Sequence, residues 1–289
     1  MIALLHARGP VTFSDWEWQP AIVVPLMVSA SLYTRGVARL WRDGRHRGVG
    51  AWQVVCFALG LLVTALGLLS PLHAISEQLF SAHMVQHELL MVLAAPLLVL
   101  GRPIVAMLWA LPPGWRLRVG GLAHNQASRS LWTTLTRPVD AWLIHGVTIW
   151  IWHLPLLFQA TLHSDVVHAA QHVSFVASAL LFWWAIIHPP RRAARGMSIV
   201  YLFTTAVHTG VLGALMSFAR APWYSQYASR SVAWGLTPLG DQQVAGMIMW
   251  IPASFAYLVA ALLIAWRWLG ESELAVNRRE RAGYAVSHS

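Results

Sequence analysis

The sequence predicts an all-α fold: a polytopic membrane helix bundle of seven transmembrane helices, with the N-terminus outside and the C-terminus inside. Composition, the number of long apolar windows and the distribution of arginine lead to this prediction. Of the 289 residues, 57% are hydrophobic and only 11% are charged, and the mean hydropathy is +0.55. Because soluble domains carry about 25% charged residues, this is the composition of a membrane protein.

Seven windows of the chain are long and apolar enough to cross a bilayer, which takes about 20 mainly apolar residues. They lie at residues 18–34, 49–69, 79–100, 141–158, 166–187, 197–219 and 244–266. The first window is short and contains Pro20 and Pro25. We therefore expect residues 1–270 to form one seven-helix transmembrane domain and the polar residues 271–289 to form a disordered cytoplasmic tail.

Arginine is distributed unequally between the two sides of the predicted bundle. All 20 basic residues are Arg, and 17 of them lie in alternate connections or in the C-terminal tail, which leaves three on the other side. Since cytoplasmic connections carry the excess of basic residues, the N-terminus is expected outside. Seven spans satisfy this alternation, whereas six or eight break it. Because the Arg residues cluster between apolar spans, we expect a lipid bilayer and no nucleic acid as partner.

Two histidine pairs lie within the apolar windows. His83 and His87 are four residues apart, as are His168 and His172, and side chains at this spacing share one face of a helix. With the predicted orientation, both pairs lie in the outer halves of their helices. Ionisable side chains are costly in hydrocarbon and usually mark a functional site. We therefore predict that the four imidazoles converge as metal ligands.

The neighbouring side chains bear on the identity of the metal. Neutral imidazole suits copper, zinc and iron, and thioethers beside it favour Cu(I). Further candidates for ligands or for supporting hydrogen bonds are His153, Glu88, Asp241, Met84, Met247 and Met249. Methionine is also a common packing residue in apolar helices, and Asp241 is equally well placed to cap the last helix. Copper, preferably as Cu(I), is the expected metal.

Longer motifs in the chain resemble one known family. HMVQH at 83–87, followed by an apolar run, resembles the hallmark of the CtaG family of polytopic cytochrome c oxidase assembly factors. WIWHLP at 150–155, HAAQHVSF at 168–175 and DQQVAGMIMW at 241–250 resemble further motifs of that family, in the same order. The likeness extends over residues 49–266.

This resemblance implies a multi-pass protein of the bacterial inner membrane that helps to mature haem-copper oxidases. It also implies that copper is handled for the catalytic subunit of cytochrome c oxidase. We expect no enzymatic activity, because the sequence shows no nucleophile motif, phosphate loop or paired catalytic carboxylates. Cys56 is the single cysteine, so a CxxC copper motif is also absent.

Two other functions stay open at the level of sequence. Histidines on facing helices can ligate a haem axially, which would make the protein a haem-binding membrane redox protein. A copper transporter needs polar groups that continue to the inner face, and His145 and His208 begin such a path. A single intramembrane histidine is, however, often only a hydrogen-bonding contact between helices. A non-enzymatic copper-binding assembly factor is the leading hypothesis.

Overall fold

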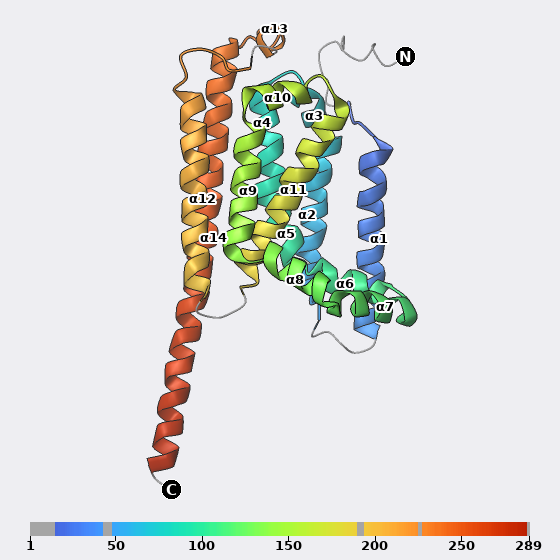
Figure 1. The fold of residues 1–289 in the computed structure, drawn as a ribbon, viewed down its shortest axis with the longest axis vertical. Helices are drawn as coiled ribbons and strands as arrows, with labels where there is room; N and C mark the ends of the chain where they lie inside the picture. Colours follow the sequence, from blue (N-terminus) through green and yellow to red (C-terminus); the bar gives the residue numbers. More distant parts are fainter. Residues whose placement is uncertain (1–14, 43–47, 190–193, 225–226, 288–289) are drawn as a thin grey trace.

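Every regular element in the described part of the chain is a helix (Figure 1). The computed structural model describes residues 15–42, 48–189, 194–224 and 227–287. Six helices are long and apolar enough to cross a membrane, and a bent pair of helices makes a seventh crossing if it counts as one span. The predicted all-α membrane bundle is confirmed, while the orientation of its termini stays a prediction.

The spans run between two ends that carry shorter helices (Figure 1). The spans are α1 (Pro20–Arg42), α2 (Ala51–Leu69), the third span (Phe80–Leu100), α9 (Pro138–Trp152) with α10 (Pro155–Thr161), α11 (Asp165–Ile187), α12 (Ala194–Ser217) and α14 (Pro238–Ser287). The upper end in Figure 1 carries α3 (Pro71–Ser76), α10 and α13 (Ala228–Val232). The lower end carries α6 (Pro103–Ala110), α7 (Pro113–His124) and α8 (Gln126–Leu135).

The third span is continuous but not a regular α-helix. It consists of α4 (Phe80–Glu88), a π-helical segment η1 (Leu89–Ala94) and α5 (Ala95–Leu100). The N–H of Ala95 donates to the carbonyl of Leu90, five residues earlier, which is the π pattern. Such segments are frequent at functional sites, and this one begins two residues after the second histidine of the HMVQH motif.

Proline explains the irregular segment and ties it to another span. In the π pattern, the next donor after Ala95 would be the N–H of residue 96, paired with the carbonyl of Met91. Pro96 has no N–H. The indole Nε1–H of Trp183 on α11 donates to the Met91 carbonyl instead, at 2.9 Å. A buried carbonyl is thereby satisfied, and α11 is joined to the third span.

The fourth predicted span is broken. The sequence predicts one helix over 141–158, but α9 ends at Trp152, α10 begins at Pro155 and the two axes differ by 78°. The helical region is disfavoured for a residue before proline, and Leu154 is accordingly extended, with φ −64° and ψ 129°. With 15 residues, α9 is about 22 Å long at about 1.5 Å per residue. The break places His153 at the end of this short helix.

Helices α12 and α14 form a tight pair beside α9 (Figure 1). Their backbones meet at Gly213 and Gly246, where a Cβ on Gly246 would lie 2.5 Å from the Gly213 carbonyl oxygen. Small residues allow such close approach of membrane helices. Helix α14 also packs against α4. The pair of α12 and α14 therefore contacts the third span through α14.

The last helix extends past the predicted membrane domain. The backbone of α14 is helical as far as Ser287, and in Figure 1 it projects beyond the lower end of the bundle. The sequence predicts a disordered tail over 271–289, and the backbone of the described part of that segment is helical. The division of the chain into a membrane domain and a separate tail stays a prediction.

Candidate metal centre

Two neighbouring helices each present a histidine pair. Helix α4 carries His83 and His87, whose Nε2 atoms lie 2.7 Å apart. Helix α11 carries His168 and His172, whose Nε2 atoms lie 2.8 Å apart. Both distances are those of a hydrogen bond in which one ring donates and the other accepts. The spacing of four residues therefore brings the two rings of each pair together, as predicted from the sequence.

The two pairs also face each other across the bundle. Ring centroids are 5.7 Å apart for His83 and His168, and 5.1 Å apart for His87 and His172. The diagonal from His83 to His172 is 6.2 Å. We call these four residues the histidine cluster. The structure brings the four predicted imidazoles together near the upper end of the bundle, and their role as metal ligands stays a prediction.

Aromatic side chains hold the histidine cluster in place. The ring of Phe158 meets His83 edge-on at 5.2 Å, and that of Phe175 meets His87 edge-on at 4.6 Å. His83 is 1% exposed and His87 is 2% exposed. Packing against rings restricts the imidazoles to small rotations, which keeps their nitrogens close together.

Several ring nitrogens near the cluster are buried without a hydrogen-bond partner among the described residues. They include Nδ1 of His87, Nδ1 of His172 and Nε2 of His153. His153 Nδ1 lies 2.7 Å from the carbonyl oxygen of Ile149, so Nδ1 carries the hydrogen and a neutral ring keeps a lone pair on Nε2. The ring of His153 is also close enough to His83 for a charge on one ring to act on the other. The donor set therefore fits a metal that prefers imidazole nitrogen.

The rings are close together but not yet placed as ligands. Among the described residues, no group of three or more His, Cys, Asp or Glu side chains has the arrangement of a metal site. Two nitrogens bound to one ion at about 2.0 Å are about 3.3 Å apart in tetrahedral geometry, which exceeds the 2.7 Å between His83 and His87 Nε2. Binding would need each hydrogen-bonded pair to open by roughly half an ångström.

A fifth histidine, which was not among the site residues predicted from the sequence, joins the group. His73 on α3 stacks on His168, with centroids 5.9 Å apart, and is 7% exposed. Its Nδ1 lies 3.0 Å from Nε2 of Gln86, and the same amide donates to the Gly67 carbonyl at 2.7 Å. Gln86 lies inside the HMVQH motif. An amide side chain within a membrane span was the sequence signal for a polar partner such as His73.

Asp241 supports the site differently from either role considered from the sequence. Its carboxylate oxygens accept hydrogen bonds from the backbone N–H groups of Phe80 at 2.7 Å and Ser81 at 3.0 Å. The residue is fully buried. Asp241 on α14 therefore caps α4, the helix of His83 and His87, rather than its own helix or an imidazole.

The remaining candidates differ in their surroundings. Glu88 has a buried carboxylate oxygen without a hydrogen-bond partner in the described ranges and lies within electrostatic range of Tyr257 on α14. Met84 and Met249 are buried in the apolar core. Met247 is 43% exposed, and its role at the site stays a prediction.

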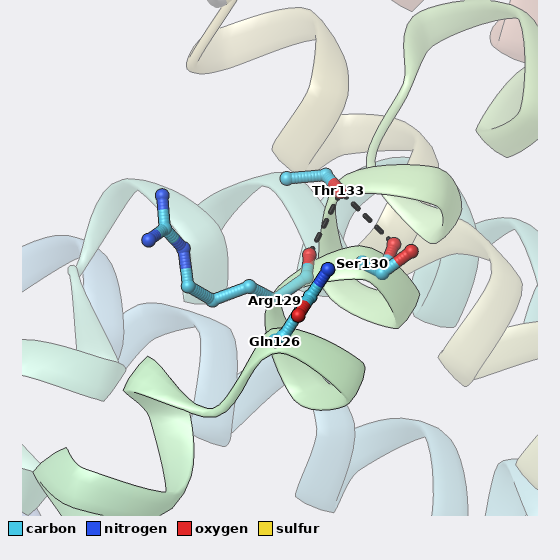
Figure 2. A pocket seen from close by; sticks show the side chains of 4 residues that line it. All are labelled: Gln126, Arg129, Ser130 and Thr133. Carbon is cyan, nitrogen blue, oxygen red and sulfur yellow. Dashed lines mark hydrogen bonds between the residues drawn. The ribbon is translucent and has the colours of Figure 1, made fainter.

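Two hollows open at opposite ends of the molecule. One, of about 240 Å³, lies at the upper end, and its lining includes His83 and His168. The other, of about 460 Å³, lies on α8 at the lower end and is lined by Gln126, Arg129, Ser130 and Thr133 (Figure 2). The described residues that line this lower hollow include no imidazole, so it lacks the ligands that a metal preferring imidazole nitrogen needs.

These features define a class: a multi-pass membrane protein with buried imidazoles gathered near one end of its helical bundle. A family model described as cytochrome c oxidase caa3 assembly factor (Caa3_CtaG) matches residues 31–271. The chain belongs to this family of assembly factors, which confirms the resemblance seen in the sequence motifs.

Curated relatives add similarity but no function. Uncharacterized proteins of Mycobacterium bovis and Mycobacterium tuberculosis are each 28% identical over 280 residues, covering 92% of this chain and 41% of their own length. An uncharacterized protein of Mycobacterium leprae is 26% identical over 283 residues, covering 93% of this chain and 42% of its own length. The chain thus spans about two fifths of the length of these relatives. No solved structure matches it significantly.

Proposed function

We propose that the protein binds copper at the histidine cluster and passes it to the catalytic subunit of a haem-copper cytochrome c oxidase. In this proposal it acts in the bacterial inner membrane, without catalysing a reaction, and its cluster faces the periplasm. The observation that carries the proposal is the convergence of His83 and His87 with His168 and His172, at centroid distances of 5.1 to 6.2 Å. The family supplies the connection to oxidase assembly.

The packing of the cluster favours an ion over a haem. A haem ligated by two histidines lies as a flat ring between them. Here the facing rings are 5.1 Å apart at His87 and His172, and Phe175 closes the side of His87 at 4.6 Å. A porphyrin would need these aromatic contacts to separate, whereas an ion needs only small ring rotations.

The core below the cluster favours hand-over on one side of the membrane over transport across it. Beneath His87 and His153, the buried residues include Ile149, Phe175 and Phe182. His145, deeper in α9, is hydrogen-bonded through Nδ1 to the hydroxyl of Ser178 at 3.1 Å and stacks on Phe182. An apolar layer therefore separates the cluster from the deeper histidines, and a cation crossing this layer would lose its ligands.

Copper binding by the purified protein tests the proposal directly. We expect the wild type to bind Cu(I) under anaerobic reducing conditions in competition with a chromogenic chelator. The double variant His83→Ala/His87→Ala should lose this binding, since it removes half of the cluster. His188→Ala is the matched control, because His188 lies at the opposite end of α11 and stacks on Trp184.

The visible spectrum of the same sample separates copper from haem. Copper binding by the double variant equal to that of the wild type overturns the copper site. A Soret band that is lost in the double variant would instead identify the cluster as a haem site.

A further inference from the structure

We propose that the upper hollow is the route by which a metal cation reaches the histidine cluster, with Glu77 and Asp165 as the charges that attract it. This inference rests on the proposed function. It goes beyond the proposed metal site, because it gives a role to two carboxylates that are not needed as ligands. The hollow, of about 240 Å³, is lined by both carboxylates and by His83 and His168. Arg230 also lines it, so two negative charges face one positive charge. It therefore connects exposed acidic residues with one imidazole from each pair.

The order of residues along two helices builds this route. Asp165 is exposed and lies at the start of α11, three residues before His168, so the two share a helix face. Glu77 is exposed and ends α3, just before the helix of His83. Each carboxylate thus lies on the surface side of a ligand candidate, and a cation leaving one of them meets an imidazole next.

Helix α13 forms the third wall and is fastened to the rim. Arg230 donates to the backbone carbonyl of Glu77 at 2.7 Å, and Tyr227 donates to the carbonyl of Ser76 at 3.0 Å. Next to α13, the indole of Trp234 donates to the side-chain oxygen of Gln78 at 2.8 Å. Three side chains therefore hold the segment 227–234 against the turn 76–78.

The hydrogen bond that Tyr227 donates to the Ser76 carbonyl does not change with pH near neutrality. Burial is the main cause that raises the pKa of the Tyr227 hydroxyl above its usual value. The hydroxyl therefore stays protonated and continues to donate to Ser76. Because Arg230 donates to the backbone carbonyl of Glu77 and not to its side chain, Glu77→Gln leaves that hydrogen bond in place.

The kinetics of copper loading test the role of the rim charges. In Glu77→Gln/Asp165→Asn, we expect the rate of Cu(I) binding at low salt to fall by roughly fivefold, since steering by local charge raises association rates by tenfold or more. The equilibrium affinity should change little, because the ligands are intact. Added salt should slow the wild type more than the variant. Asp140→Asn, at the other end of the bundle, is the control.

Blocking the hollow covalently tests the route itself. Ala233 lines the hollow and is exposed, so Ala233→Cys in a Cys56→Ala background can be labelled with a bulky, membrane-impermeant maleimide. Labelling should prevent Cu(I) loading. Val232→Cys is the matched control, because Val232 is 62% exposed but does not line the hollow.

The outcomes separate this inference from the proposed function. If the wild type binds Cu(I), and both the rim variant and labelled Ala233→Cys load at the wild-type rate, the route is wrong while the copper site stands. If the wild type binds no Cu(I), the proposed function itself fails. A fall in affinity with an unchanged loading rate would show that the carboxylates are ligands, which also contradicts the route.

Discussion

Asp241 shows how one residue far along the chain can position a site that it does not touch. Its two carboxylate oxygens each accept one backbone N–H at the start of α4. The first N–H groups of a helix have no partner within that helix, and in a membrane each unpaired group is costly. Asp241 therefore fixes where α4 begins, and with it the height of His83 and His87.

Replacing Asp241 with Ala removes the acceptor of two buried N–H groups. We expect the free energy of unfolding to fall by about 2 kcal/mol, within the range for a lost cap or an unsatisfied buried donor. Asp241→Asn keeps one acceptor oxygen and should lose about half as much. Chemical denaturation in detergent micelles measures both.

Asp140→Asn is the control for this comparison. Asp140 is partly exposed and pairs with the exposed Arg137, with 3.6 Å between carboxylate oxygen and Nε. Solvent-accessible pairs of this kind contribute about 0–1 kcal/mol. If Asp241→Ala unfolds like the wild type, the carboxylate does not hold α4 in place.

At the scale of elements, two prolines break the regularity of the helices that surround the cluster. Pro96 lies just after the π-helical segment Leu89–Ala94 in the third span, and Pro155 begins α10 after the 78° bend. Each break frees backbone carbonyls that side chains then satisfy. Tyr224 donates to the carbonyl of His153 at 2.8 Å, as Trp183 does to that of Met91.

The bond from Trp183 to Met91 can be tested by a rescue. In Trp183→Phe the Met91 carbonyl loses its donor, and we expect a loss of about 1 kcal/mol in the free energy of unfolding. Pro96→Ala restores an N–H that the π pattern directs to this carbonyl. In the Trp183→Phe background it should recover part of the loss, while in the wild type its effect should be smaller.

A double-mutant cycle gives the coupling energy between the two positions. Trp184→Phe is the control, because the Trp184 ring contacts His188 at the end of α11. Strictly additive effects of Trp183→Phe and Pro96→Ala would contradict the proposed sharing of the Met91 carbonyl.

For the whole molecule, the two ends differ in chemistry. The upper end holds the histidine cluster, and the lower end carries α7 and α8 with Arg116, Arg118 and Arg129 (Figure 1). Residues 103–137 contain no Asp or Glu. Since basic residues gather at the cytoplasmic face, where anionic lipids attract them, we predict that this end is cytoplasmic and that the cluster faces the periplasm.

Labelling of single cysteines in intact cells tests that orientation. In a Cys56→Ala background, Val232→Cys near the upper end should react with a membrane-impermeant thiol reagent. Gly114→Cys in α7 should react only after the membrane is opened; a Cβ at Gly114 has open space around it. The reverse pattern would place the cluster in the cytoplasm and contradict copper delivery from the periplasmic side.

The sequence by itself determined the membrane class, most of the spans and the four imidazoles of the cluster. These features depend on local patterns: about 20 apolar residues make a span, and a spacing of four puts His83 beside His87 and His168 beside His172. The bend at Pro155 also had a local signal in the sequence. The prediction missed it because the hydrophobicity of 141–158 is continuous across the break.

Only the tertiary structure decided how distant segments complete the site. His73 joins the group because α3 folds back beside the third span. Asp241 caps α4 because α14 packs against it. The packing of α14 also leaves Met247 43% exposed. A periodic pattern gives the faces of one helix but not its rotation or height relative to another. Those are set by the packing of many side chains at once, such as the contact of Gly213 with Gly246.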